Sequence, residues 1–269
     1  MVENERMIIA RGRTADVLAL GNDQVLKLFY DWVPAIWIEH ETAAARLVSR
    51  TDLPTPRLLG EQVLDGRHGL IYERVTGPSL LSLLVSHPWN CIKYARLLAG
   101  LHVVIHKQRG EGLPSLKVNL AWTIQHLEGL PNDLLKTALD RLSQLPDGDT
   151  LCHFDFHPDQ VLVTADGPVI IDWMAVLNGQ PAADIARSEV VIRFGPLLHA
   201  SWLEKHLVGV IRRIFFRAYL TRYRKLNPSV TLAEIQEWLP LVALARLAEK
   251  IPGEENQLQS IIQTAFKGI

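Results

Sequence analysis

Polar residues crowd the segment His153-Phe154-Asp155-Phe156-His157-Pro158-Asp159-Gln160, near the middle of this 269-residue chain. The apolar run Val161-Leu162-Val163 follows, and beyond the turn signal Ala165-Asp166-Gly167 a second apolar run ends at Ile170-Ile171-Asp172-Trp173. We therefore predict one β-hairpin, with strands over residues 151–164 and 168–172. Asp155 and Asp172, one from each strand, would converge at its rim.

Two converging carboxylates are a common arrangement for holding a divalent cation with oxygen ligands. Mg²⁺ is the natural candidate, because it accepts one or two carboxylates together with substrate phosphates, and Gln160 could add a side-chain carbonyl oxygen. The same stretch is also compatible with a surface hairpin, in which both aspartates are solvated and His153 is a hydrogen-bonded core residue.

The first 75 residues predict a small β-rich lobe with one helix. Short apolar runs predict strands over residues 7–10, 16–20, 25–29, 57–64 and 68–73, with turn signals at Gly21-Asn22-Asp23 and Asp65-Gly66-Arg67. A helix over residues 36–49 ends before the breaker Pro54-Thr55-Pro56.

Residues 76–269 predict a larger, mainly helical lobe that includes the hairpin. Leucine-rich helical spacing covers residues 80–84, 92–106 and 133–145. Four or so further helices are expected between residues 181 and 266, with stops at Gly195-Pro196, Asn227-Pro228 and Pro252-Gly253. The fold class is therefore α+β.

Composition excludes several classes of protein. A hydrophobic content of 48% argues against a disordered or fibrous chain, and a net charge of -1 offers no basic surface for nucleic acid. Cys91 and Cys152 form no disulfide framework or metal spacing, and no apolar run reaches the roughly 18 residues of a membrane span. We expect a cytoplasmic protein, monomeric or weakly dimeric, with no nucleic-acid or membrane partner.

The spacing His153-x-Asp155-x4-Gln160, with Ile171-Asp172 on the next strand, resembles the Brenner-type motif of aminoglycoside phosphotransferases and the related choline-kinase-like small-molecule kinases. The resemblance covers about residues 8–187 and implies a two-lobed protein-kinase-like fold. It implies a nucleotide-binding lobe over residues 1–75, and a lobe with the catalytic hairpin and acceptor site over residues 76–269. Asp155 would accept or orient the proton of the attacking hydroxyl, and Asp172 would be the principal magnesium ligand beside Gln160.

The same resemblance implies a site for ATP or GTP. Lys27, within Val25-Leu26-Lys27-Leu28-Phe29, would contact the α- and β-phosphates, with Glu41 as its ion-pair partner; Glu39 faces elsewhere on the helix. The segment over residues 70–77 resembles the hinge between lobes. Around the base, the resemblance implies backbone groups of Glu73 and Val75 at the adenine edge, with Leu162 and Ile171 as an apolar floor.

Two departures keep a second class of function open. Gln160 stands where most of the family has Asn, although maltokinases resemble this chain there, and the loop Arg11-Gly12-Arg13-Thr14-Ala15 has a single glycine. Both would suit a nucleotide-binding pseudokinase with a regulatory or scaffold role, whereas Lys27, Glu41, Asp155 and Asp172 favour an enzyme. A protein kinase ranks lowest, because only eleven residues separate Asp172 from Asp184 and leave no activation segment.

Four further residues have proposed supporting or packing roles. Asp184 resembles the aspartate that braces the catalytic loop through backbone hydrogen bonds, and His153 would support that loop. His102 and His106 have zinc-like spacing, but the sequence indicates no third ligand, so packing on a helix face is the favoured interpretation.

The late helices, where this family binds its acceptor, carry a basic excess. Residues 181–227 contain nine Lys or Arg and three acidic side chains, which argues against a polycationic aminoglycoside and favours an anionic or neutral acceptor. The alternative is that these cations form the solvated face of one long helix. We predict an ATP- or GTP-dependent, magnesium-assisted transfer of the γ-phosphoryl group to a hydroxyl of a small molecule.

Overall fold

The computed structural model describes residues 7–195 and 202–267, and residues 202–205 without their side chains. The polar start at residues 1–6, the proline of the predicted stop at Gly195-Pro196, and the counted side chains of Glu204 and Lys205 lie outside that description. The chain forms two compact units. The first contains the residues up to Leu80 and Asp159–Ala175, and the second contains Leu81–Pro158 and the residues from Val176 onward.

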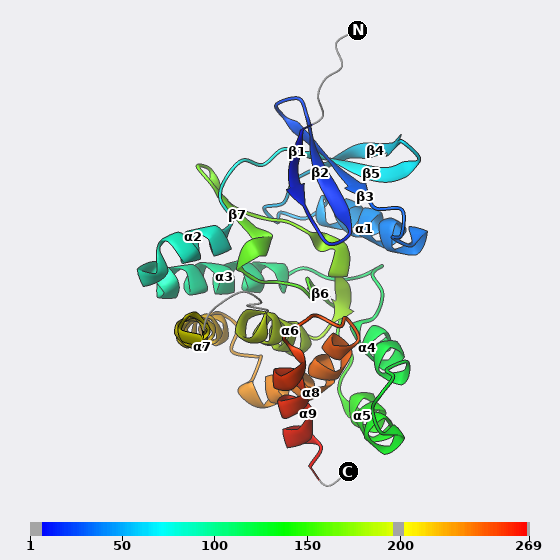
Figure 1. The fold of residues 1–269 in the computed structure, drawn as a ribbon, viewed down its shortest axis with the longest axis vertical. Helices are drawn as coiled ribbons and strands as arrows, with labels where there is room; N and C mark the ends of the chain where they lie inside the picture. The colour runs from blue at the N-terminus through cyan, green and yellow to red at the C-terminus, as the bar shows by residue number, and fades with distance from the viewer. Residues whose placement is uncertain (1–6, 196–201, 268–269) are drawn as a thin grey trace. The chain divides into compact units, whose positions relative to one another are not determined.

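The first unit is built on an antiparallel five-stranded sheet with the strand order β1-β2-β3-β5-β4 (Figure 1). Side chains alternate between its faces, as expected for strands. Leu18, Leu26 and Leu28 pack on one face, while Phe29 and Leu70 pack on the other. The strands are β1 (Ile8–Arg11), β2 (Ala15–Leu20), β3 (Gln24–Phe29), β4 (Leu58–Leu64) and β5 (Arg67–Glu73), and α1 (Ala35–Val48) adds Ile38 to the second face.

The hairpin of β7 (Val161–Thr164) and β8 (Gly167–Ile170) belongs to this first unit. Its backbone is tied to earlier segments, since the Val163 N–H donates to the Pro78 carbonyl and the Ile170 N–H to the Pro54 carbonyl. Gly77 permits the approach, because a Cβ there would lie 2.3 Å from the Val163 carbonyl oxygen. From the sequence we expected this hairpin in the helical lobe, whereas these two backbone hydrogen bonds join it to the β-rich first unit.

The prediction of one strand over residues 151–164 is wrong. β6 (Thr150–Cys152) ends early and pairs with β9 (Leu177–Gly179) in the second unit, and a loop with a 3₁₀ turn at Pro158–Gln160 precedes β7. Proline lacks a backbone donor for a strand ladder, and the polar residues before it suit a loop. Asp155 and Asp172 therefore follow strands of two different sheets rather than the strands of one hairpin.

The second unit is mainly helical, as predicted, and contains one helix that the spacing analysis missed. In α4 (Leu116–Gln125), Leu116, Leu120 and Ile124 are buried at intervals of four residues, and the Ser115 side chain caps the helix by accepting from Val118 N–H. The other helices are α2 (Leu80–Ser86), η1 (Pro88–Asn90), α3 (Cys91–Ile105), α5 (Asn132–Gln144), α6 (Pro181–Phe194), α7 (Trp202–Leu226), α8 (Leu232–Leu247) and α9 (Glu255–Ala265).

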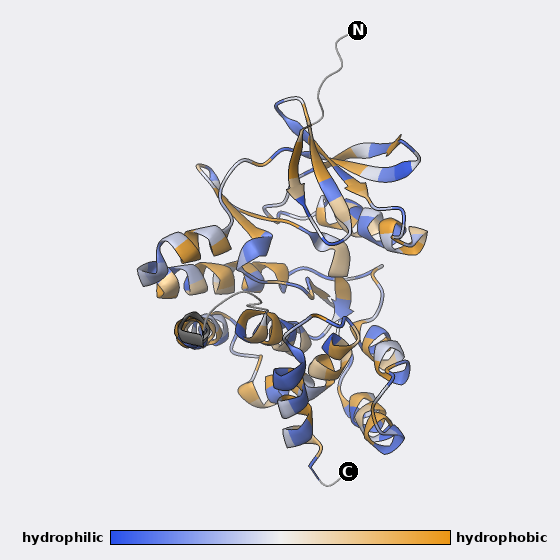
Figure 2. Ribbon diagram, in the orientation of Figure 1, coloured by the Kyte–Doolittle hydropathy of each residue, from blue (hydrophilic) through white to orange (hydrophobic). Residues whose placement is uncertain are grey.

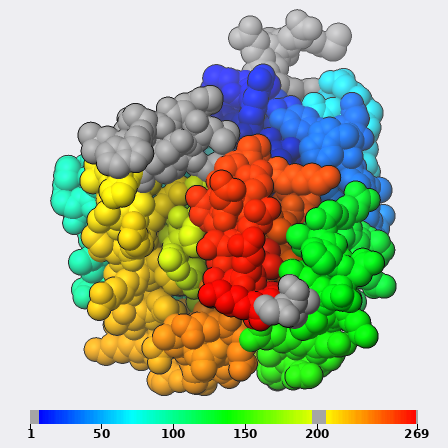
Figure 3. All heavy atoms as spheres, turned by 60° about the horizontal axis from the view of Figure 1, so that its bottom comes forward, coloured from blue at the N-terminus to red at the C-terminus, as the bar shows by residue number. Residues whose placement is uncertain are grey.

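These helices bury α6 at the centre of the unit. α3 packs along α7, and α6 packs against both α7 and α8. Figure 3 shows α9 at the surface between α7 and the α4–α5 pair, and Figure 2 shows the mixed polar and apolar colouring of α5 and α9 that surface helices require. Within residues 7–195 and 202–267, no helix has the length and apolar character needed to cross a bilayer.

Candidate active site

The first unit holds a lysine between two carboxylates. Lys27 Nζ lies 2.7 Å from Glu41 Oε1 and 2.8 Å from Asp172 Oδ1. The expected ion pair between Lys27 and Glu41 is thus present, and Asp172, which follows the β7–β8 hairpin, joins it. Burial is graded across the three groups, with side-chain exposures of 2% for Glu41, 16% for Lys27 and 41% for Asp172. The partly exposed end of this cluster is therefore Asp172.

Electrostatics favour a permanently charged Lys27. Burial alone would lower the pKa of Lys27, but the carboxylates of Asp172 and Glu41 outweigh burial and raise that pKa above its usual range. Burial raises the pKa of Glu41, and the charge of Lys27 offsets only part of that rise. An anion brought to Lys27 would thus meet a charged ammonium group that two carboxylates already neutralise.

Glu41 is held on one oxygen only. Its Oε1 accepts from Lys27 and, at 3.4 Å, from the hydroxyl of Tyr72, a residue that the sequence analysis did not select. Its Oε2 is buried and has no hydrogen-bond partner among residues 7–195 and 202–267. The carboxylate therefore retains an unused acceptor beside Lys27, which leaves it able to follow the lysine if the ammonium group moves.

Asp172 and Gln160 are neighbours through the hairpin backbone. The Ile171 N–H donates to the Gln160 carbonyl at 3.0 Å, so the residue beside Asp172 is bonded to Gln160 itself. Asp172 has a φ of 63°, a left-handed conformation that aspartate tolerates and that often occurs at functional sites. The following Trp173 anchors the turn, because its indole Nε1 donates to Thr55 Oγ1 at 2.9 Å.

The four residues expected around a base all lie in the first unit. Leu162 forms an antiparallel bridge with Ser79, two residues beyond Gly77, and this bridge places β7 against the hinge segment. Glu73 ends β5 and its N–H donates to the Arg57 carbonyl. Val75 follows in the hinge, and Ile171 follows β8. Their roles in nucleotide binding stay predictions.

In the second unit, Asp155 lies in a loop whose backbone Asp184 holds. Asp184 Oδ2 accepts from the His153 N–H at 2.7 Å and Oδ1 accepts from the Phe154 N–H at 2.9 Å. The expected backbone contacts of Asp184 are therefore present. Phe154 needs such support, because its φ of 59° is a strained value for a bulky residue.

Two further side chains of α6 fix the same loop, and the sequence analysis missed both in this role. Arg187 Nε donates to the Phe154 carbonyl at 3.1 Å, and its guanidinium lies over the Phe154 ring. Ser188 Oγ donates to the Phe156 carbonyl at 2.8 Å. The spacing of Asp184, Arg187 and Ser188 along one helix face was the available signal. Asp184 thus pairs with backbone N–H donors of the loop, and Arg187 and Ser188 pair with its carbonyl acceptors.

Arg187 and His157 flank the carboxylate of Asp155, whose side chain is 29% exposed. Arg187 Nη2 lies 3.7 Å from Asp155 Oδ1, and His157 Nε2 lies 3.8 Å from Oδ2. Arg187 also binds Glu249 Oε1 at 2.6 Å, so its guanidinium is held between α6 and the segment after α8. Asp155 is thus an accessible carboxylate on a rigid loop, which is what a proton acceptor requires.

Two features together define a kinase-like phosphotransferase. One is a strand lysine that pairs with a helix glutamate and with an aspartate after a short hairpin; the other is a separate aspartate loop held by a buried helix. The chain belongs to the phosphotransferase enzyme family, whose model matches residues 7–228. The resemblance seen in the sequence and the expected α+β kinase-like fold are both confirmed.

Solved structures agree on the fold. An amicoumacin kinase, hAmiN, determined in complex with AMP-PNP, Ca²⁺ and Ami, is similar at 15% identity and a TM-score of 0.63, over 97% of this chain and 88% of that one. A choline/ethanolamine kinase family protein from Mesorhizobium loti has 15% identity and a TM-score of 0.59, over 97% and 85%. A choline kinase from Cryptosporidium parvum has 14% identity and a TM-score of 0.58, over 97% and 88%. No curated protein matches the chain.

Proposed function

We propose that this protein transfers the γ-phosphoryl group of ATP or GTP to a hydroxyl of a small molecule. The observation that carries the proposal is the position of Lys27, whose Nζ lies within 2.8 Å of both Glu41 and Asp172. A lysine fixed by a glutamate beside an aspartate is the arrangement that positions the phosphates in kinases. The reaction would take place in the cytoplasm, where nucleotide and Mg²⁺ are supplied.

The first unit would bind the nucleotide. Lys27 would neutralise the α- and β-phosphates, with Glu41 fixing its direction. The carbonyl of Glu73 would meet the base, since the N–H of that residue already donates to Arg57, and Val75 would contribute a second backbone group. Leu162 and Ile171 would form the apolar surface beneath the base.

Asp172 and Gln160 would hold Mg²⁺. Their carboxylate and amide oxygens are the hard ligands that Mg²⁺ accepts, and the backbone bond between Ile171 and Gln160 keeps the two residues adjacent. Asp172 is also the exposed member of the lysine cluster, so a carboxylate oxygen can reach an ion. When bound, the ion would supply positive charge to the β- and γ-phosphates.

Asp155 would receive the proton of the acceptor hydroxyl. Arg187 and Asp184 hold its loop rigid, so the carboxylate is fixed before substrate arrives, and positioning accounts for most of the rate in this chemistry. The transfer then forms a bond from the acceptor oxygen to the γ-phosphorus and breaks the bond to the β-phosphate oxygen. The products are a nucleoside diphosphate and a phosphorylated small molecule.

The acceptor would be neutral or anionic rather than a polycationic aminoglycoside. Arg187 already lies 3.7 Å from Asp155, so a cationic acceptor would meet like charge beside the base. The basic excess of α6 and α7 acts in the same direction. No nucleic acid or membrane is part of the proposed reaction.

Nucleotide binding is tested by the thermal midpoint with ATP or GTP, each with and without Mg²⁺. Nucleotide at about 100 times its Kd should stabilise the wild type by about 2.7 kcal/mol in the presence of Mg²⁺. Asp172→Ala should lose this shift, while the matched control Asp166→Ala, at the exposed turn of the same hairpin, should keep it. If neither nucleotide shifts the wild type, the proposed transfer is wrong, and a scaffold role that needs no nucleotide replaces the enzyme.

The role of Asp155 is tested by Asp155→Asn. This variant should bind nucleotide like the wild type, because Asp155 belongs to the other unit, and should lose the slow hydrolysis of ATP that kinases show without an acceptor. Retained hydrolysis in Asp155→Asn would remove Asp155 from the catalytic role.

A further inference from the structure

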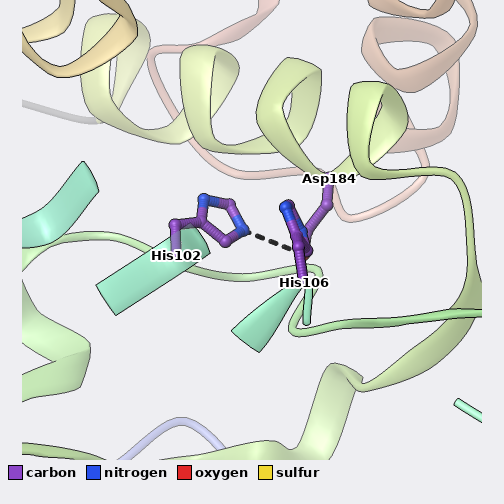
Figure 4. Close-up of side chains that lie close together, drawn as sticks. All are labelled: His102, His106 and Asp184. Carbon is purple, nitrogen blue, oxygen red and sulfur yellow. Dashed lines mark hydrogen bonds and ion pairs between the residues drawn. The ribbon is translucent and has the colours of Figure 1, made fainter. Parts of the chain in front are cut away.

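Two tyrosine–histidine pairs converge on the buried carboxylate of Asp184. Figure 4 shows the two histidines beside Asp184. His102 and His106, four residues apart on α3, point their Nε2 atoms at Asp184 Oδ2 at 3.0 and 3.1 Å. Behind them, His102 Nδ1 lies 2.5 Å from the Tyr219 hydroxyl and His106 Nδ1 lies 2.7 Å from the Tyr223 hydroxyl. The tyrosines are themselves four residues apart on α7, so the two helices pair in register.

The contacts of an ionised Asp184 select one assignment of the protons in this network. Asp184 Oδ2 also accepts from the His153 N–H, so an ionised Asp184 needs a proton on each facing Nε2. A neutral imidazole with its proton on Nε2 accepts at Nδ1, hence both tyrosine hydroxyls donate. Burial and the neighbouring His106 lower the pKa of His102 to about 4, which agrees with a neutral ring.

This network surrounds an ionised group that no described lysine or arginine neutralises within salt-bridge distance, by contrast with Glu41. Asp184 has 0% exposure and receives four N–H donors, two from the histidines and two from the catalytic loop. Burying a carboxylate is costly unless such donors replace water. The histidines therefore allow Asp184 to remain charged, and its charge strengthens the bonds to the loop.

A metal site is the other candidate, because His102, His106 and Asp184 could in principle supply three ligands. A zinc ion would need the Nε2 lone pairs and would compete with the His153 N–H for Asp184 Oδ2. The hydrogen-bonded arrangement uses all four ring nitrogens and both carboxylate oxygens without an ion.

We infer that Tyr219 and Tyr223, acting through His102 and His106, are positioning residues for Asp155. They orient the two imidazoles, the imidazoles fix Asp184, and Asp184 holds Phe154 in its left-handed conformation next to Asp155. This inference rests on the proposed catalytic role of Asp155. Helix α7 is thereby connected to the catalytic loop through side chains that touch no substrate.

The first test needs no activity. In protein with ¹⁵N-labelled histidine, long-range ¹H–¹⁵N NMR should show His102 and His106 as neutral rings protonated at Nε2. Tyr219→Phe combined with Tyr223→Phe should shift the Phe154 amide resonance. The control Tyr94→Phe changes another buried tyrosine of this unit, whose hydroxyl accepts from Asn90, and should leave that resonance unchanged. Rings protonated at Nδ1, or about one zinc ion per purified chain, would overturn the inference.

The second test is kinetic. The tyrosine double variant should reduce kcat for acceptor-independent ATP hydrolysis about tenfold, with the KM for ATP within twofold of wild type. A purely structural role would lower the thermal midpoint and leave kcat unchanged. His102→Gln, whose amide keeps a donor toward Asp184, should retain more of kcat than His102→Phe.

The two proposals fail separately. If Asp155→Asn hydrolyses ATP normally, the catalytic role fails, and the NMR result still decides whether the network exists. If Asp155→Asn is inactive while the double variant keeps both its kcat and its Phe154 resonance, the positioning role is wrong.

Discussion

The two units each bury a carboxylate next to the proposed chemistry, and they do so in opposite ways. Glu41 in the first unit is bound to a cation through one oxygen, and its other oxygen has no partner. Asp184 in the second unit has four nitrogens within hydrogen-bond distance, those of the His102 and His106 rings and of the His153 and Phe154 backbone, and no Lys or Arg among the described residues pairs with it. Their pKa values move in opposite directions, because burial dominates at Glu41, whereas at Asp184 the histidine rings outweigh burial.

This difference suits the roles that we propose for the two units. A lysine that meets a nucleotide benefits from a partner with spare hydrogen-bonding capacity, because the ammonium group can shift toward phosphate without leaving the carboxylate entirely unpaired. A loop that carries a catalytic base needs the reverse, since an error of about 1 Å can cost a large factor in rate. The pairing in the first unit leaves room for Lys27 to move, whereas the hydrogen bonds in the second unit fix the loop of Asp155.

The largest expected difference in stability is between the variants that replace Asp184 and Glu41, one at a time, by the neutral amide. Asp184→Asn turns an NH₂ group toward N–H donors, and we expect it to lower the free energy of unfolding by about 3 kcal/mol or more. Glu41→Gln can place its amide oxygen at Lys27, which keeps Asp172 as its charged partner, and should cost about 1 kcal/mol. Urea unfolding followed by circular dichroism measures both. Equal costs would remove the contrast between the units.

The pH dependence of stability should separate the units next. In the unfolded chain His102 titrates near 6.5, and in the folded chain at about 4. Between these values the unfolded state binds more protons, so stability falls as the pH falls, by about 3 kcal/mol in total. The lowered pKa of Asp184 adds a further loss only below the ordinary carboxyl range. His102→Gln should flatten the window from pH 6.5 to 4, measured as unfolding free energy; an unchanged slope would contradict the assignment.

Lys27→Met tests the first unit, in which Lys27 pairs with Glu41. Removing the ammonium group should weaken nucleotide binding about 100-fold, so that nucleotide at 100 times the wild-type Kd stabilises the variant by less than about 0.5 kcal/mol instead of about 2.7. Arg46→Met is the matched control, because Arg46 is an exposed cation of the same unit paired with Glu61. The thermal midpoint with Mg²⁺ and ATP is the measurement. A full shift in Lys27→Met would exclude Lys27 from the nucleotide site.

The smallest effects compare two hydroxyls. Tyr72 reaches Glu41 at 3.4 Å, near the limit of a hydrogen bond, whereas Tyr219 reaches His102 at 2.5 Å. Tyr72→Phe should therefore cost less than about 0.5 kcal/mol, and Tyr219→Phe about 1.5 kcal/mol. Chemical unfolding of the two single variants tests this order, and the reverse order would show that distance does not rank these bonds.

Local patterns predicted most of the elements, and failed where an element depended on a distant partner. The five strands of the first sheet, α1 and the late helices follow from apolar period and turn residues. β9 was missed because its three residues become a strand only by pairing with β6. The run from residue 151 looked like a single strand for the same reason, since sequence alone does not say which partner a short apolar run will find.

By itself the sequence determined the fold class, the family and the pairing of Lys27 with Glu41, because these depend on motif order and on residue types that allow few alternatives. Only the tertiary structure decided that Asp155 and Asp172 follow different sheets, that Arg187 and Ser188 hold the loop that carries Asp155, and that His102 and His106 face Asp184. The physical reason is burial. Two histidines on a helix have the same spacing whether they bind zinc, solvent or a carboxylate. Which of these they bind depends on the residues packed against them, here 78 or more positions away in the sequence.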